Sequence, residues 1–221
     1  ESFKFITKKQ LMVEVIAIDG PASVGKSTLA KKMSDKFNSP ILFSGRLYRA
    51  VALEIKERDI NLNNKKEIIK CVKLIDRIKL DSPNLYSSEI DKISSSISAN
   101  KYLRDELKDY QRNFPMNYAK KNKYAIIEGR DIGTVIFPDA KYKIFMWADA
   151  KIRAKRRYHQ ILKKGQKVSF KRVYKEIIER DFKDLNRKVA PLRPAVNSVL
   201  LDTTYLDIEQ AFNIIKKILK Q

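Results

Sequence analysis

Residues 15–28 read VIAIDGPASVGKST, and this stretch decides the fold of the 221-residue chain. Its first four residues form a short apolar run, as in a buried strand, and a helical pattern of apolar side chains begins at Leu29. Between the two, Gly20 to Ser27 fit the pattern G-x-x-x-x-G-K-[ST]. A strand, a glycine-rich loop and a helix in this order predict a loop that binds the phosphates of a nucleoside triphosphate.

The residue types of this loop suit phosphate binding. Glycines let successive backbone N–H groups point at phosphate oxygens, and the N-terminus of the following helix adds partial positive charge. Lys26 is expected to reach the β and γ phosphates, and the Ser27 hydroxyl is expected to be a ligand of Mg²⁺. The alternative is a glycine-rich turn that binds nothing, and four specified positions in the right context argue against it.

Further short apolar runs alternate with helical patterns along the chain. They lie at 41–43, 123–127, 142–148 and 199–202. This alternation predicts an α/β fold with a parallel sheet core and helices on both faces. Ligands of such sheets bind at the carboxyl ends of the strands. The phosphate loop and the segments 44–49 and 128–134 all follow strands, so we expect them to converge on one cleft.

The remaining segments are mostly helical in pattern. Helices are expected at 66–78, 101–119, 150–162, 169–184 and 208–220. A turn signal at Asp81 to Asn84, between short alternating runs, predicts a small β-hairpin between 79 and 93.

The chain is strongly basic, with 47 Lys and Arg against 26 Asp and Glu and a formal net charge of +21. This charge suits either a nucleic-acid or membrane binder or an enzyme for polyanionic substrates. The sequence has no zinc-finger spacing, no RNA-binding aromatic motif and no block of five or six consecutive basic residues. The enzyme interpretation is therefore favoured, with the additional lysines on solvated faces.

Two further features bear on where the protein works. No apolar run approaches the ~20 residues of a membrane helix. The single cysteine, Cys71, lies in an apolar-periodic stretch, so we expect a buried thiol in a reducing compartment. A cytoplasmic protein that does not bind membranes is the expectation.

An arginine-rich helical hairpin is predicted between 151 and 188. This span holds fifteen Lys or Arg and four acids. Arg153 shares one helix face with Arg156 and Arg157. A second helical stripe is predicted from the spacing i, i+4 and i+7 of Arg180, Asp184 and Arg187. Such a hairpin over a phosphate loop would stabilise charge on a transferring phosphoryl group and exclude water. The alternative is a charged surface helix pair.

Four segments of the chain resemble the bacterial cytidylate (CMP/dCMP) kinases, within the nucleoside monophosphate kinases. They are IDGPASVGKST (18–28), SGRLYRAVAL (44–53), EGRDIGTVIFPDA (128–140) and ERDFKDLNRKVAPLRPA (179–195). The resemblance runs from about residue 13 to the C-terminus. It implies in-line transfer of the γ-phosphate of ATP to CMP or dCMP, with Mg²⁺ and arginines stabilising charge.

The resemblance also implies an organisation. A single kinase domain at 13–221 would hold a P-loop NTPase-type core at 13–43, 120–150 and 189–221. A monophosphate-binding insert would occupy 44–119, and a helical lid would occupy 151–188. Residues 1–12 are expected to be a loosely held lead-in that need not be ordered, and the protein is expected to be a monomer.

Site residues follow from the same resemblance. Catalytic roles are implied for Lys26, Arg130 and Arg187. ATP contacts are implied for the loop and two hairpin arginines: Gly20, Pro21, Ala22, Ser23, Val24, Gly25, Lys26, Ser27, Thr28, Arg153 and Arg157. CMP contacts are implied for Ser44, Arg49, Arg130 and Arg187 at the phosphate, for Ser95, Arg104 and Asp131 at the base, and for Arg180 and Asp184 at the ribose.

Several of these assignments have structural alternatives. Arg49 could be a surface arginine, and the role of Ser95 could belong to a neighbour in the run 94–96. Arg104 could pair with Asp105 or with the helix partners of Glu106, and Asp184 could bridge Arg180 or Arg187. The chain also departs from the family pattern at Phe43, where Asp or Thr is usual, and at Glu128, where Asp is common.

Two rival functions stay open. The first is a kinase with another acceptor, such as UMP, AMP or shikimate. The second is an NTP-dependent nucleic-acid-binding or regulatory protein, which the charge suggests; against it, the sequence lacks the guanine-reading N-K-x-D pattern. The favoured partners are ATP and CMP or dCMP alone, with no nucleic acid.

Overall fold

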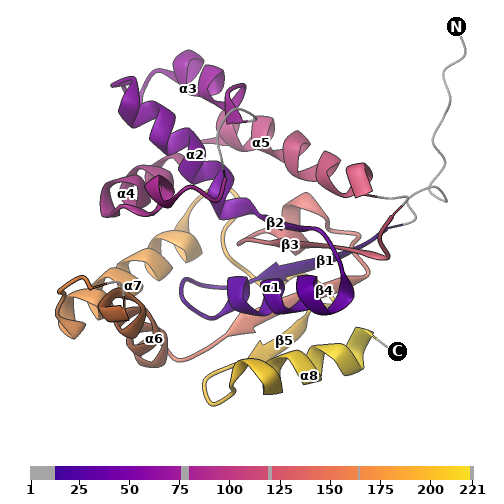
Figure 1. The fold of residues 1–221 in the computed structure, drawn as a ribbon. Helices are drawn as coiled ribbons and strands as arrows, with labels where there is room; N and C mark the ends of the chain where they lie inside the picture. Colours follow the sequence, from indigo (N-terminus) through magenta and orange to yellow (C-terminus); the bar gives the residue numbers. More distant parts are fainter. Residues whose placement is uncertain (1–12, 76–79, 119–120, 164, 220–221) are drawn as a thin grey trace, which may run out of the picture.

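A parallel β-sheet forms the centre of the computed structural model, which describes residues 13–75, 80–118, 121–163 and 165–219 (Figure 1). Within these residues the sheet has five strands in the order β2-β3-β1-β4-β5. The strands are β1 (Glu14–Asp19), β2 (Ile41–Phe43), β3 (Tyr124–Glu128), β4 (Tyr142–Trp147) and β5 (Val199–Asp202). Every neighbouring pair is parallel, so the predicted α/β fold is confirmed.

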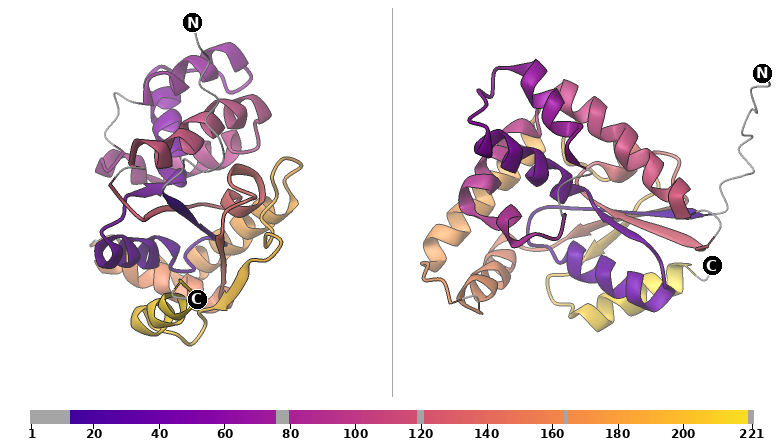
Figure 2. Two further views of the ribbon diagram at one scale, coloured as in Figure 1. Left: turned by 90° about the vertical axis from the view of Figure 1, so that its right-hand side faces the viewer. Right: turned by 45° about the horizontal axis from the view of Figure 1, so that its top comes forward.

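Helices cover both faces of this sheet, as predicted (Figures 1 and 2). Ile16 and Ile18 of β1 face one core with α1 (Lys26–Phe37) and α8 (Ile208–Leu219). Ala17 between them faces a second core with the helices of the other side, because successive side chains of a strand point to opposite faces. These helices are α2 (Ser44–Glu57), α3 (Lys65–Val72), α4 (Ser88–Ile97) and α5 (Lys101–Asn113).

The structure has two helices between residues 83 and 97 in place of strands, so the predicted β-hairpin is wrong within the described residues. A 3₁₀-helix, η2 (Pro83–Tyr86), precedes α4. The Ser82 hydroxyl accepts the N–H of Asn84, and the Ser87 hydroxyl accepts the N–H of Ile90, so serines cap both helical starts. Ile90 and Ile97 then lie on one buried face at helical spacing. The two serine caps favour helix over strand in this segment. The alternation of apolar and polar residues, on which the prediction rested, does not reveal such caps.

Other helix ends differ from the expected ones. Helix α3 ends at Val72, and the predicted residues 76–78 lie outside the described part of the chain. Helix α5 ends at Asn113 and continues as a 3₁₀-helix, η3 (Phe114–Tyr118), while residue 119 is again outside it. The predicted lead-in at 1–12 is not among the described residues either.

The predicted basic hairpin is formed by α6 (Ala150–Lys163) and α7 (Phe170–Asn186). A small apolar cluster of Ala154, Val173 and Ile177 packs the two helices together, and Ala22 of the phosphate loop belongs to the same cluster. Arg187 caps α7 in an extended conformation (φ −65°, ψ 140°), so the predicted helical stripe ends at Asp184. Through Ala22, the hairpin packs against the phosphate loop that it was expected to cover.

Two smaller expectations can be compared with the fold. The Cys71 thiol is buried in the core beneath α2 to α5, as predicted. Among the described residues, every helix is too short or too polar to cross a membrane.

Gly20 gives a test of how closely the start of the loop approaches β4. Its φ is +148°, and an added Cβ would lie 2.3 Å from the Met146 carbonyl oxygen. We expect Gly20→Ala to lower the free energy of unfolding by about 1–3 kcal/mol, because backbone would have to move. Urea unfolding measures the change.

The matched control is Gly45→Ala. Gly45 is exposed in α2, and an added Cβ meets nothing within 4 Å. Alanine should therefore leave the free energy of unfolding unchanged or raise it by about 0.5–1 kcal/mol. Equal stability of the two variants would contradict the close approach at Gly20.

Candidate functional site

The phosphate loop connects the end of β1 to the first residue of α1. Gly20, Ser23 and Gly25 have φ values of 148°, 58° and 103°, which turn the backbone sharply between strand and helix. The N-cap residue of α1 is Gly25, which has no side chain that could cap the helix. Backbone N–H groups at this helix start are therefore available to a ligand, and an anion suits the positive end of the helix.

Lys26 lies under the loop and is almost fully buried. Its Nζ donates to the Pro21 carbonyl at 2.7 Å. Burial, and after it the nearby Arg130, lower the pKa of Lys26 to about 7. An anion that binds in the loop would stabilise the ammonium form of Lys26 and so raise its pKa again.

Asp19 ties the phosphate loop to the segment after β3. Its two carboxylate oxygens accept the backbone N–H groups of Ile132 at 2.8 Å and Gly133 at 2.7 Å. These N–H groups begin a π-helical turn, η4 (Ile132–Ile136). Burial raises the pKa of Asp19 to about 7, although both hydrogen bonds act in the opposite direction. Asp19 thus fixes where Arg130 and Asp131 stand relative to the loop.

Two side-chain oxygen donors lie next to Lys26, on Ser27 and Glu128. The Ser27 hydroxyl donates to Glu128 Oε2 at 3.0 Å, and Glu128 is the last residue of β3. Hydroxyl and carboxylate oxygens are hard donors of the kind that Mg²⁺ accepts together with water and phosphate oxygens. Within the described residues, no group of three or more His, Cys, Asp or Glu is placed to hold a metal. These two side chains therefore fit a magnesium ion that is carried in with a phosphate ligand.

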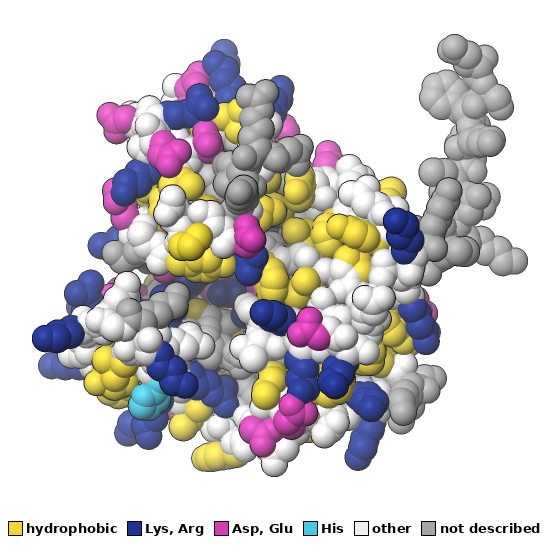
Figure 3. All heavy atoms as spheres, in the orientation of Figure 1, with side chains coloured by type: hydrophobic (Ala, Val, Ile, Leu, Met, Phe, Trp, Pro, Cys, Tyr) yellow, Lys and Arg dark blue, Asp and Glu magenta, His cyan; other side chains and the backbone are white. Residues whose placement is uncertain are grey.

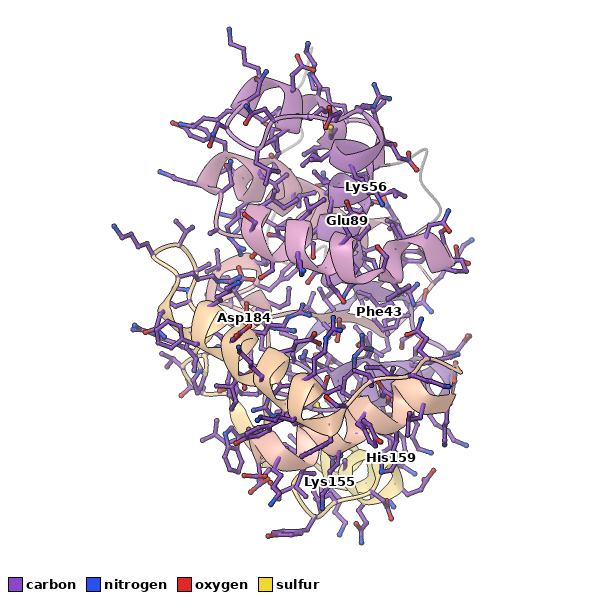
Figure 4. The ribbon with its side chains drawn as sticks, turned by 90° about the vertical axis from the view of Figure 1, so that its left-hand side faces the viewer. Phe43, Lys56, Glu89, Lys155, His159 and Asp184 are labelled. Carbon is purple, nitrogen blue, oxygen red and sulfur yellow. The ribbon has the colours of Figure 1, made fainter. Side chains whose placement is uncertain are left out.

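A second pocket opens between α2, α4, α5, the end of β3 and α7. It brings together all of the residues predicted to contact CMP: Ser44, Arg49, Ser95, Arg104, Arg130, Asp131, Arg180, Asp184 and Arg187. Five arginines and two aspartates among its lining make it strongly basic. Figure 4 shows Asp184 on α7, where that helix faces α4. The pocket suits an anionic ligand with further polar groups.

Asp131 is the centre of one ion-pair network in this pocket. Arg104 pairs with Asp131 Oδ2 and also donates to the Ser98 carbonyl at 2.9 Å. Arg187 Nη2 lies 3.8 Å from Asp131 Oδ1. The alternative that Arg104 pairs with its helix neighbours is therefore wrong, since its carboxylate partner comes from the loop after β3.

Asp184 is the centre of a second network. It accepts a hydrogen bond from Arg130 Nε at 3.0 Å, and Arg187 Nη1 lies 4.0 Å from its other oxygen. Burial alone would raise the pKa of Asp184, but Arg130, Arg180 and Arg187 together lower it. A structural ion pair does exist, and its closest partner is Arg130.

The three hairpin arginines of α6 do not form one phosphate-facing stripe. Arg153 is 4% exposed and donates to the carbonyls of Ala22 at 3.1 Å and Ala148 at 2.9 Å. Its other nitrogen donates to Asp181 Oδ2 at 2.5 Å. Arg153 thus binds the loop backbone, and its contact with ATP stays a prediction.

Arg156 and Arg157 leave α6 in other directions. Arg156 donates to the Thr203 carbonyl at 2.5 Å, in the segment between β5 and α8. Arg157 is partly exposed and lies 4.0 Å from Asp91 Oδ2 of α4. Of the two, only Arg157 contacts α4, and its contact with ATP stays a prediction.

Sequence reasoning assigned no role to several residues that the structure places in or next to these sites: Asp19, Glu128, Gly45, Tyr48, Ser98 and Gly129. Tyr48 follows Ser44 by four residues on α2, so helical spacing could have found it. Burial raises the pKa of Tyr48 to about 12, and the Arg104 guanidinium lies 5.7 Å from its ring centre. Ser94 also lines the pocket, beside Ser95.

The surface charge is spread rather than gathered on the face that Figure 3 shows. Lys and Arg side chains there alternate with Asp and Glu and with apolar patches. Within the described residues, five arginines do lie close together, because they line the same pocket.

Comparisons with known proteins agree with this geometry. The family model described as "Cytidylate kinase" matches residues 16–221. A cytidylate kinase of Fusobacterium nucleatum is 40% identical over 214 residues, which cover 92% of this chain and 95% of that protein. A cytidylate kinase of Bartonella tribocorum is 40% identical over 200 residues, covering 90% and 91%.

Solved structures support the fold. The Thermus thermophilus protein TT1252 superposes with a TM-score of 0.53 at 17% identity, covering 94% of this chain and 97% of its own. A sugar kinase from Janibacter gives a TM-score of 0.50 at 12% identity, covering 94% and 95%. The family model and the close relatives span most of the chain, and the chain therefore belongs to the cytidylate kinase family.

Proposed function

We propose that the protein transfers the γ-phosphate of ATP to CMP or dCMP and releases ADP with CDP or dCDP. One observation carries the proposal. The triphosphate loop and a pocket lined by five arginines meet at the carboxyl edge of one sheet, in a chain of the cytidylate kinase family. The enzyme is then a nucleoside monophosphate kinase.

The donor half of the reaction uses the loop 20–28. Its backbone N–H groups and the start of α1 hold the triphosphate, and Lys26 neutralises charge at the β and γ phosphates. Ser27 and Glu128 would hold Mg²⁺, which neutralises charge on the phosphates when it is bound. Arg157, near the cleft, and Arg153, behind the loop, are the hairpin arginines assigned to ATP.

The acceptor half uses the basic pocket. Ser44 and Arg49 would bind the CMP phosphate together with Arg130 and Arg187. The remaining lining residues would read the base and the ribose: Ser95, Arg104 and Asp131 for the base, and Arg180 and Asp184 for the ribose. Planar guanidinium groups suit this ligand because two N–H groups match two phosphate oxygens.

No strong general base is needed for this reaction. The attacking atom is a phosphate oxygen that is already anionic, so the residues supply alignment and charge stabilisation. Lys26, Arg130 and Arg187 come from three different elements and can surround the transferred group. A hairpin that closes over the cleft, as a lid at 151–188, would keep water away from it.

The proposal includes a cellular setting. The protein would act in the cytoplasm on small molecules, as a monomer, without nucleic acid or membrane. The domain division into a core, a monophosphate-binding region at 44–119 and a lid is part of the same proposal.

Replacing Lys26 tests the donor site. We expect Lys26→Ala to lower kcat at least about a hundredfold, because removal of a preorganised charge at the transferred group has costs of that order. The fold should persist, as circular dichroism would show. Lys31→Ala, at an exposed position of the same helix, should keep normal turnover. Rapid CDP formation by Lys26→Ala would refute the assigned role of Lys26.

Proton uptake tests the environment of Lys26. With a pKa of about 7, Lys26 is mostly neutral at pH 8, and bound phosphates should raise that pKa. Binding of ATP at pH 8 should therefore take up protons. Titration calorimetry in two buffers of different ionisation enthalpy measures the uptake. Lys26→Arg, which stays charged, should reduce it, and equal heats in both buffers for the unaltered protein would contradict the lowered pKa.

An acceptor panel tests the substrate. ADP release with CMP, dCMP, UMP, AMP and shikimate should be fastest with CMP or dCMP, because the basic pocket also holds Asp131 and Arg104, the pair that this proposal assigns to the cytosine base. Addition of RNA or DNA should leave ATP hydrolysis unchanged. A preference for AMP would overturn the acceptor assignment, and salt-sensitive stimulation by nucleic acid would favour the rival class.

A further inference from the structure

Asp91 lies on α4, one helical turn before the pocket residues Ser94 and Ser95. Its side chain is 23% exposed, and the residues that line the pocket do not include it. It therefore lies beside the pocket, on the same face of α4 as the two serines. None of the roles assigned above uses this carboxylate.

Three arginines from three helices converge on Asp91. Arg49 of α2 pairs with Oδ1, and Arg180 Nη1 of α7 lies 3.8 Å from the same oxygen. Arg157 Nη2 of α6 lies 4.0 Å from Oδ2. Asp91 and Arg49 belong to the helices on one side of the cleft, whereas the other two arginines belong to the hairpin on the opposite side (Figures 1 and 4).

The contacts of Arg49 show what Asp91 does to it. Arg49 Nη1 donates to the Leu85 carbonyl at 2.9 Å, and its guanidinium lies 5.1 Å from the ring centre of Tyr86. The Asp91 carboxylate adds the charged contact that holds the second nitrogen. A long, flexible arginine is thereby held against the pocket wall, with less orientational freedom to lose when a phosphate arrives.

Arg180 needs a negative partner for a different reason. It lines the same pocket, and both burial and the neighbouring Arg130 lower its pKa. Asp184 and Asp91 are the carboxylates that offset this unfavourable environment. Asp91 is also the one that links Arg180 to Arg49 across the cleft, since both arginines lie near its Oδ1.

We propose that Asp91 is a positioning residue that holds Arg49 toward the phosphate and Arg180 toward the ribose of the acceptor nucleotide, from opposite sides of the cleft. The proposal rests on the proposed function, because both arginines are held for the acceptor nucleotide. Asp91 does not itself line the pocket, and the nucleotide would approach both guanidinium groups from the pocket side.

The charge of Asp91 also acts in the opposite direction. A carboxylate near two arginines repels an incoming phosphate, so its removal could strengthen acceptor binding. The geometry favours positioning, because Asp91 is set back one turn from the pocket-lining serines. The two effects change the KM for CMP in opposite directions, so one measurement separates them.

The test is steady-state kinetics of Asp91→Asn, which keeps the shape of the side chain and removes its charge. We expect the KM for CMP to rise about tenfold, which is the change that one lost charge-assisted contact of about 1.4 kcal/mol produces. The KM for ATP and kcat should change less than about threefold, because the donor loop and Lys26 are untouched and Arg157, the one arginine near Asp91 that is assigned to ATP, lies 4.0 Å away. Asp91→Glu should recover part of the affinity for CMP.

The matched control lies on the same helix. Glu89 of α4 is exposed and pairs with Lys56 of α2, next to which Figure 4 shows it, and neither residue lines the pocket. Glu89→Gln removes an equal charge and should leave every kinetic constant unchanged. Thermal unfolding of each variant checks the fold, and Asp91→Ser is the second variant if Asp91→Asn does not fold.

The outcomes separate the two proposals. If the unaltered protein does not phosphorylate CMP, the proposed function fails. If it does so, and Asp91→Asn has a KM for CMP equal to or below the original value, the positioning role of Asp91 alone is overturned. An equal rise in the KM for ATP would also overturn it, because that result would indicate a general disturbance of the cleft.

Discussion

The buried carboxylate of Asp19 is the constraint on which the site depends. It ends the strand that carries the phosphate loop, and it accepts the two N–H groups that start η4. These hydrogen bonds connect the donor loop to the segment of Arg130 and Asp131, although more than a hundred residues separate them in sequence. A change of position at one site therefore moves the other. For a transfer between two bound nucleotides, this connection fixes the distance that matters.

Charge compensation is the second organising principle of the cleft. Guanidinium groups from α2, α5, α6 and α7 share three aspartates, Asp91, Asp131 and Asp184, in place of having one partner each. Because the arginines outnumber the aspartates, the pocket keeps a net positive charge, which an anionic ligand can neutralise. It also keeps the arginines folded inward in the absence of that ligand, because a buried cation without any partner would be costly.

Much of the fold could be predicted because its signals are local. The apolar runs of β1 to β5 and the glycine pattern at 20–25 are visible in short windows of sequence. The failure at 80–97 has an equally local cause: Ser82 and Ser87 act as helix caps, and capping depends on one hydrogen bond that alternation of apolar residues does not reveal. Arg187 shows the same limit, since helical spacing does not say where a helix ends.

The sequence by itself determined the donor loop, the alternation of strands and helices, and the set of arginines and aspartates that the cleft contains. Only the tertiary structure decided how these charges pair. Arg104 pairs with Asp131 rather than with a helix neighbour, and Arg153 donates to the backbone of the phosphate loop. Asp91 contacts arginines from both sides of the cleft. The reason is physical: the energy of an ion pair depends on distance and burial, and folding alone sets both for residues far apart in the chain.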